Sequence, residues 1–291
     1  MRILLAAALL AATAAGAQTP PATPTPAAPA VSSEWRALDP QNTLLIETTK
    51  GRIIVEMRPD LAPLTVARIK ALTRQGYYSG AQFYRVIEGF MAQTGDKGAK
   101  TFRSSLPNLK GEMTFALTST APYVSVGSSP AGDVGYVGSV PVTIASAPGA
   151  PPAPAGQAPS SGHGNIVFCP GIVAMAHPNN QPDGGNSQFF MMRQYAPSLE
   201  KAFAAWGRIV VGQEVVYALK NGEPVVNPDR MTSVRVLADV PAAQRPTVEV
   251  TNYDGPKMAA AAQAAVAAKG NAFTLCDIPF QARINGTVVG P

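Results

Sequence analysis

The chain has 291 residues, of which 28 are Pro, 26 are Gly and only 14% are charged. Backbone breakers at this density exclude coiled coils and helical solenoids, because both need long uninterrupted helices. The net charge of +5 arises from 23 Lys and Arg that are scattered rather than clustered, so a nucleic-acid-binding protein is not expected.

Residues 1–17 have the organisation of a secretory signal peptide. Arg2 is followed by an apolar run from Ile3 to Ala12 and then by Ala15-Gly16-Ala17, a typical small-residue cleavage site. We therefore expect cleavage after Ala17 and export of the mature chain. No other apolar stretch is long enough to cross a bilayer, so no membrane span is expected after the signal is removed.

Two segments rich in proline interrupt the chain. Residues 18–36 are interpreted as a spacer, because the part up to Val31 carries five prolines and no charge, a composition that favours extended polyproline conformations. The second segment is an insertion at about residues 120–164, dominated by Gly, Pro, Ser and Ala. We predict a surface loop there, with Pro148–Pro159 as its least regular part.

The remaining sequence predicts short strands with a helix near each end. Residues 43–47 and 52–57 are rich in branched aliphatic side chains and are separated by a hairpin turn. Residues 63–75 follow as a helix, with Pro63 in its first turn. Further strands are predicted at 82–87, 90–94, 172–176, 188–192, 206–210 and 232–238, and a second helix at 213–220. This order favours a mainly β fold, a closed barrel capped by helices.

Little of the chemistry that most enzymes use is present. The only histidines are His163 and His177, and neither belongs to a nucleophile motif or shows the spacing of a metal site. No glycine-rich phosphate loop occurs either. We therefore expect no metal and no cofactor.

Cys169 and Cys276 are the only cysteines. In an exported chain a disulfide and two free buried thiols are both open interpretations. A disulfide would join the C-terminal extension, residues 241–291, to the barrel. Lys257–Lys269 within the extension is Ala-rich and favours a helix.

Three segments, taken in order, resemble the signature segments of the cyclophilins, the peptidyl-prolyl cis-trans isomerases. They are Phe83–Asp96 (FYRVIEGFMAQTGD), Gly171–Ala176 continuing to Asn186–Phe190, and Leu199–Gly212. The similarity covers about 200 residues, and we assign residues 37–240 to a cyclophilin-like domain. The resemblance implies an eight-stranded antiparallel barrel with two capping helices.

The resemblance also implies roles for individual residues. Arg85 matches the catalytic arginine, and Gln93 matches the glutamine that binds the substrate backbone and helps to place the arginine. The other matching positions bind the substrate, either as the proline pocket or along the groove: Phe90, Met91, Phe190, Leu199 and Phe203 in the pocket, Gln188 in the groove, and Ala176 and His177 through main-chain groups. Without the resemblance, the apolar members would be interpreted as core residues and Arg85 as an exposed strand residue.

Several positions differ from the family pattern. Tyr84 replaces a histidine, Glu88 a proline and His177 an asparagine, which we expect to alter the rim more than the pocket. Ser198 stands where cyclosporin-sensitive members carry Trp, so weak cyclosporin binding is predicted. Phe203 replaces a histidine and predicts a wholly apolar pocket wall, with slower turnover or a changed substrate preference.

The resulting functional prediction is a monomeric periplasmic isomerase that acts on proline bonds of unfolded or partly folded polypeptides. The alternative is a cyclophilin-shaped binding module or holdase that grips proline segments with little isomerisation. A third hypothesis is that the Pro-rich insertion occupies the groove as an autoinhibitor.

Overall fold

The structure is a computed structural model that describes residues 33–95, 103–117, 123–145 and 162–290. The predicted signal peptide, most of the predicted spacer and Pro148–Pro159 lie outside these residues. No helix among the described residues has the length and apolar character needed to span a membrane.

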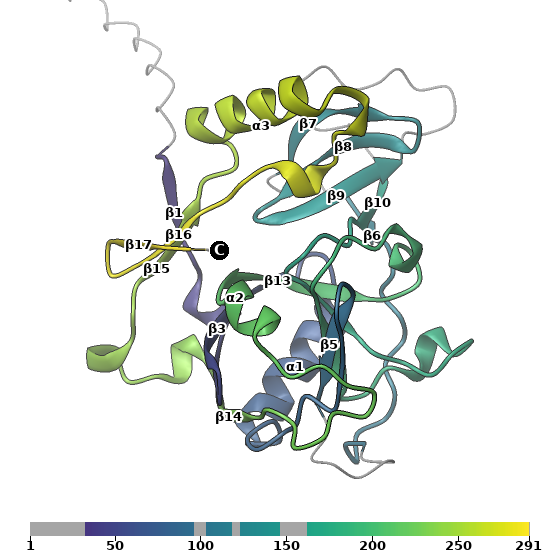
Figure 1. Ribbon diagram of the computed structural model, residues 1–291, viewed down its shortest axis with the longest axis vertical. Coiled ribbons are helices and arrows are strands. Elements are labelled where there is room, and N and C mark those ends of the chain that lie inside the picture. Colours follow the sequence, from purple (N-terminus) through teal and green to yellow (C-terminus); the bar gives the residue numbers. More distant parts are fainter. Residues whose placement is uncertain (1–32, 96–102, 118–122, 146–161, 291) are drawn as a thin grey trace, which may run out of the picture. The chain divides into compact units, whose positions relative to one another are not determined.

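An eight-stranded antiparallel sheet forms the centre of the fold (Figure 1). Its strands, in spatial order, are β14 (Met231–Val236), β2 (Thr43–Thr48), β3 (Gly51–Met57), β13 (Ala205–Val211), β11 (Ile172–Met175), β12 (Phe189–Met192), β5 (Met91–Thr94) and β4 (Arg85–Ile87). The segment before β4 meets the start of β14, because Phe83 N donates to Asp229 O at 2.9 Å and Met231 N to Ala81 O at 2.9 Å. The two edges of the sheet are thereby joined, as the prediction of a mainly β barrel requires.

The two predicted helices pack against this sheet. Helix α1 (Pro63–Arg74) buries Val66, Ile69 and Leu72 at a helical spacing, and α2 (Gln213–Tyr217) follows β13. The barrel interior is filled by side chains from alternate strand positions, including Phe189, Met191 and Trp206. Residues between them on the same strands point to the other face, as the period of two in a strand dictates.

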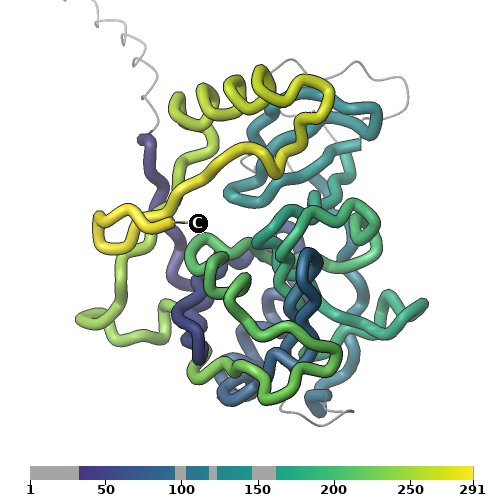
Figure 2. The backbone as a smooth tube through the Cα atoms, viewed as in Figure 1, coloured from purple at the N-terminus to yellow at the C-terminus, as the bar shows by residue number. Residues whose placement is uncertain are grey.

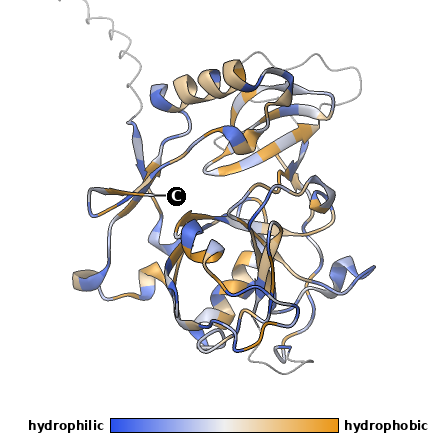
Figure 3. Cartoon of the chain, in the orientation of Figure 1, coloured by the Kyte–Doolittle hydropathy of each residue, from blue (hydrophilic) through white to orange (hydrophobic). Residues whose placement is uncertain are grey.

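The insertion is not a surface loop over residues 123–145, so that prediction is wrong there. These residues form the hairpin strands β7 (Tyr123–Ser129), β8 (Gly132–Val137) and β9 (Val140–Ala145), which join β10 (His163–Ile166) and β6 (Phe115–Ala116) in a five-stranded sheet. Tyr136, Val140 and Ile144 are fully or almost fully buried. Figure 3 shows the hydrophobic character of β9. Serine and glycine occupy mainly the exposed β7 positions and the turns, and they conceal the strand pattern in the sequence.

The end of the predicted spacer is also a strand. Strand β1 (Trp35–Ala37) pairs with β15 (Val248–Thr251) of the C-terminal extension, and β16 (Ala282–Ile284) and β17 (Thr287–Val289) complete a third sheet (Figure 2). The extension also contains α3 (Pro256–Lys269). Two cation–aromatic contacts support β1, since Lys257 and Arg283 lie 5.1 and 4.8 Å from the Trp35 ring centre.

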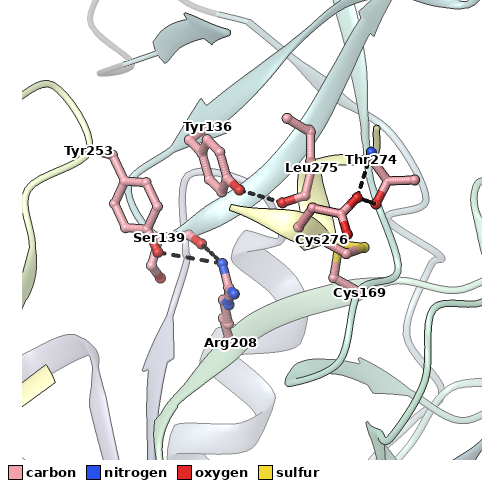
Figure 4. Close-up of a disulfide and its surroundings, with 9 residues drawn as sticks. Tyr136, Ser139, Cys169, Arg208, Tyr253, Thr274, Leu275 and Cys276 are labelled. Atoms are coloured by element: carbon pink, nitrogen blue, oxygen red, sulfur yellow. Dashed lines mark hydrogen bonds between the residues drawn. A yellow bond between two sulfur atoms is a disulfide. The ribbon is translucent and has the colours of Figure 1, made fainter. Parts of the chain in front are cut away.

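A disulfide joins Cys169 to Cys276, with the two Cα atoms 5.3 Å apart (Figure 4). Next to it, Tyr136 of the five-stranded sheet donates a hydrogen bond to Leu275 O at 2.6 Å. Leu275 and Ile278 are buried in the same apolar cluster as Val137 and Phe190. The extension is therefore attached by a covalent bond, by a buried hydrogen bond and by apolar packing.

A buried carboxylate connects the three sheets. Glu56 on β3 is 5% exposed and accepts from Arg36 of β1 at 2.9 Å, from Arg58 at 3.4 Å and from the hydroxyl of Ser139 at 2.5 Å. Ser139 lies in the turn between β8 and β9, and its carbonyl accepts from Arg208 of β13 at 2.8 Å. Because a buried charge is costly unless it is paired, this network favours one arrangement of the sheets.

Candidate active site

A pocket of about 310 Å³ lies on the outer side of β4, β5 and β12. It brings together all the predicted site residues except Gln188, and it adds Asn179. The lining residues are Arg85, Phe90, Met91, Gln93, Ala176, His177, Asn179, Phe190, Leu199 and Phe203.

Strand register explains why residues from distant segments meet here. Arg85 pairs with Gln93 between β4 and β5, and Gln93 pairs with Phe190 between β5 and β12. Directly opposed residues in antiparallel strands project to the same face. Met91, two residues before Gln93, shares that face, whereas Ala92 between them points into the barrel core.

Aromatic rings form the apolar part of the pocket. The Phe190 and Phe203 rings meet edge to face with centroids 5.3 Å apart. The imidazole of His177 stacks on Phe203 at 4.4 Å, and its two ring nitrogens lie 2.9 Å from the carbonyl oxygens of Pro178 and Ala202. The prediction of a wholly apolar wall is therefore wrong, because the stacked His177 contributes a polar ring.

Arg85 stands at the polar edge of the pocket with about a third of its side chain exposed (34%). Its Nη1 lies 3.5 Å from Gln93 Oε1 and 3.9 Å from Met91 Sδ. Its Nε donates to a carboxylate oxygen of Glu223, with which it forms an ion pair. A charged donor group is thus held beside an apolar cavity.

Tyr84 joins the two glutamines of the groove. Its hydroxyl accepts from Gln93 Nε2 at 2.5 Å and donates to Gln188 Oε1 at 2.8 Å. A hydroxyl can do both at once, so a single side chain fixes the orientation of both amides. The expectation that Tyr84 alters mainly the rim is therefore wrong, since its hydroxyl bonds Gln93, a pocket residue that in turn contacts Arg85.

A second hollow of about 260 Å³ adjoins the pocket and shares Gln93, Ala176 and His177 with it. Gln188 lines this hollow, together with Arg103. The main-chain N–H of Ala176 donates to Gln188 O at 2.8 Å, so this donor is already used in holding the two segments together. The two hollows therefore adjoin at these three shared residues, and together they are called the groove.

The described part of the insertion contributes nothing to this groove, since no residue of 123–145 lines either hollow. The hypothesis of an autoinhibitory insertion therefore concerns residues 120–122 and 146–161, which lie outside the described part of the chain. Among the described residues, no group of three or more His, Cys, Asp or Glu is placed to hold a metal ion.

Sequence reasoning missed Glu223, which is 138 positions from Arg85, and also Asn179 and Arg103. Glu223 carries no local motif, because its relation to Arg85 exists only after the barrel edges meet. The conformation of Gly222, with φ of 156°, reflects the tight path of this segment but gives no sign of function.

The chain is similar in sequence to known proteins. Residues 43–238 match the family described as cyclophilin type peptidyl-prolyl cis-trans isomerase/CLD. A probable peptidyl-prolyl cis-trans isomerase of Brucella suis biovar 1 (strain 1330) is 34% identical over 70% of this chain and 86% of its own length. A peptidyl-prolyl cis-trans isomerase of Synechococcus elongatus is 27% identical over 67% of this chain and 96% of its own length.

The fold is likewise similar to a solved structure. The crystal structure of cyclophilin AquaCyp293 from Hirschia baltica superposes with a TM-score of 0.75 at 29% identity, covering 88% of this chain and 94% of the other. The shared region is therefore larger than the 43–238 match alone.

Proposed function

Because the chain belongs to the cyclophilin-type peptidyl-prolyl cis-trans isomerases, we propose that Arg85 and the adjoining apolar pocket lower the barrier to X-Pro rotation. The observation that carries this mechanism is the position of the Arg85 guanidinium, within 4 Å of two residues that line the pocket. The pocket would hold the pyrrolidine ring while the guanidinium faces the amide.

The reaction needs no bond cleavage. Rotation about the amide C–N bond is opposed by about 18–20 kcal/mol, because the bond has partial double-bond character. In the twisted amide this resonance is lost and the prolyl nitrogen becomes a better hydrogen-bond acceptor. A fixed cationic donor therefore stabilises the transition state more than either planar isomer, which is the requirement for catalysis.

Each part of the site has a place in this mechanism. Phe190, Phe203 and Leu199 would bind the proline ring through apolar contact. Gln93 would accept from Arg85 and, oriented by Tyr84, bind the substrate backbone. Arginine suits the central role because it stays protonated and presents several donors in one rigid plane.

The proposed substrates are proline-containing segments of unfolded or partly folded proteins in the periplasm. The signal-peptide pattern of residues 1–17 supports export, and the disulfide between Cys169 and Cys276 suits an oxidising compartment. N-terminal sequencing of the protein from a periplasmic fraction should begin at Gln18. Recovery of the uncleaved chain from the cytosol would contradict this location.

The mechanism is tested by NMR exchange on an X-Pro peptide with the wild type, Arg85→Ala and the control Arg52→Ala. Arg52 also forms an exposed ion pair, with Glu47 at 2.7 Å, but it lies in the β2–β3 hairpin. Loss of a fixed donor typically costs about 100-fold or more in rate, so Arg85→Ala should lose most of its activity while Arg52→Ala keeps it. Equal rates for all three would refute the proposed role. If instead the wild type binds the peptide without accelerating exchange, the binding-module alternative is correct.

A further inference from the structure

The guanidinium of Arg85 has contacts of two kinds. Its Nη1 faces the pocket residues Met91 and Gln93, whereas its Nε donates to Glu223. Glu223 is itself well exposed, with 56% of its side chain accessible. An exposed ion pair between freely moving side chains would contribute little to stability, so the pair matters only if the backbone holds the carboxylate in place.

The backbone does hold it. Gly222 and Val86 exchange two hydrogen bonds, with Gly222 N to Val86 O at 2.8 Å and Val86 N to Gly222 O at 2.9 Å. One step further, Val225 N donates to Tyr84 O at 2.9 Å. The residues around Glu223 are therefore bonded to the two residues that flank Arg85, which places the carboxylate opposite the arginine.

Packing around the segment leaves it little freedom. Val225 is 7% exposed and belongs to the barrel core. A Cβ added at Gly222 would lie 2.8 Å from Val225 Cα and 2.9 Å from Pro224 O, so the chain turns tightly there. Two other acidic side chains near this edge have different partners: Glu88 accepts from Asn221 Nδ2 at 3.4 Å, and Asp229 accepts from Lys220 N at 3.0 Å.

We propose that Glu223 is a positioning residue that fixes the plane of the Arg85 guanidinium, an inference that rests on the role proposed above for Arg85. A guanidinium has five N–H donors in one plane. Contacts at Nε and Nη1 fix that plane, and among the described residues the two donors of Nη2 make no hydrogen bond. Glu223 thereby leaves Nη2 available to the substrate amide. Because the Arg85 side chain is already ordered, no conformational entropy has to be lost to order it during the reaction.

The same ion pair could also have the opposite effect, if Glu223 competed with the substrate for the guanidinium of Arg85. If Glu223 had to be displaced before Arg85 could bind the substrate, removing its charge would accelerate the reaction. The two effects differ in sign, so one substitution distinguishes them.

The test compares Glu223→Gln with the matched control Glu47→Gln, which removes the carboxylate of the exposed Arg52 ion pair outside the site. We expect Glu223→Gln to lower kcat by about 10-fold with KM little changed, as for a loss of orientation, and the control to match the wild type. In ¹⁵N NMR, the Arg85 Nε–H signal should shift and exchange faster with water in Glu223→Gln. The melting temperature should be unaffected.

An unchanged or increased rate for Glu223→Gln, or an unchanged Arg85 Nε–H signal, would overturn the positioning role. Arg85→Ala, assayed in the same series, separates this failure from that of the proposed mechanism. If Arg85→Ala is inactive and Glu223→Gln is fully active, only the positioning role is wrong. If Arg85→Ala is fully active, the mechanism is wrong and the inference falls with it.

Discussion

Removal of the Cys169–Cys276 disulfide should destabilise the protein strongly without changing the isomerase site. The bond joins residues 107 positions apart. In the chain-entropy model, a disulfide that closes a loop of this length stabilises the folded state by about 5 kcal/mol at 25 °C. That is a large share of the 5–15 kcal/mol by which domains are typically stable.

The native contacts of the extension should survive the loss of the bond. Tyr136 still donates to Leu275 O, and Leu275 and Ile278 remain buried. We therefore expect a double variant, Cys169→Ala with Cys276→Ala, that is folded but unfolds at a much lower urea concentration. Alanine is preferred to serine, because Cys169 is 1% exposed and a hydroxyl there would lack a partner.

The assay is urea unfolding of the oxidised wild type, the reduced wild type and the double variant, followed by fluorescence. The reduced wild type and the double variant should agree with each other and differ from the oxidised protein. Isomerase activity in the absence of urea should be equal in all three, since neither cysteine lines the pocket. Identical urea midpoints for the oxidised protein and the double variant would refute the reasoning.

Three further predictions concern polar side chains that are buried or half-buried. Tyr84→Phe removes the hydroxyl that joins Gln93 to Gln188 and should lower kcat/KM about five-fold, because a hydrogen bond contributes about 1 kcal/mol. The control Tyr217→Phe, at an exposed position, should have no effect. Equal kcat/KM values for the two variants would contradict this prediction. Glu56→Gln should lower the free energy of unfolding by about 3 kcal/mol, because the buried Arg58 loses its buried carboxylate partner and keeps only the exposed Asp60. A urea midpoint equal to that of Glu47→Gln would count against it. Burial raises the pKa of Tyr136 to about 12, while Arg208 opposes the shift. Folding therefore favours the neutral phenol of Tyr136. The stability that this preference adds to the folded state is complete below pH 10 and should be lost as the pH rises towards 12. The melting temperature of the wild type should fall between pH 10 and pH 12, and that of Tyr136→Phe should fall less steeply. A wild-type melting temperature that stays constant over this range would show that Tyr136 is not buried as described.

The barrel strands could be predicted from the sequence because their side chains alternate or run as branched aliphatic stretches. The same reasoning failed for β7–β9. There, serine and glycine fall mainly in turns and at exposed or half-buried β7 positions, and burial depends on the extension and the barrel rather than on local pattern. Strand β1 was missed because its three residues find their partner in β15, more than two hundred positions away.

The apolar pocket and Arg85 could be predicted because they lie within contiguous motifs. The contacts that orient them could not. Tyr84 bridges Gln93 of β5 and Gln188, which directly precedes β12, and Glu223 reaches Arg85 only because Gly222 and Val225 bond to the residues flanking it. Such relations depend on strand register and on the joining of the barrel edges, which no local pattern encodes.

The proposed role of Arg85 is to stabilise the transition state of X-Pro rotation. It is tested most directly by NMR line-shape measurement of the exchange rate on a saturating X-Pro peptide, together with the peptide Kd, for the wild type and Arg85→Ala. We predict that Arg85→Ala lowers the bound-state exchange rate by about 100-fold or more and leaves the Kd within about three-fold, because the apolar pocket is intact. A bound-state rate equal to that of the wild type would contradict it.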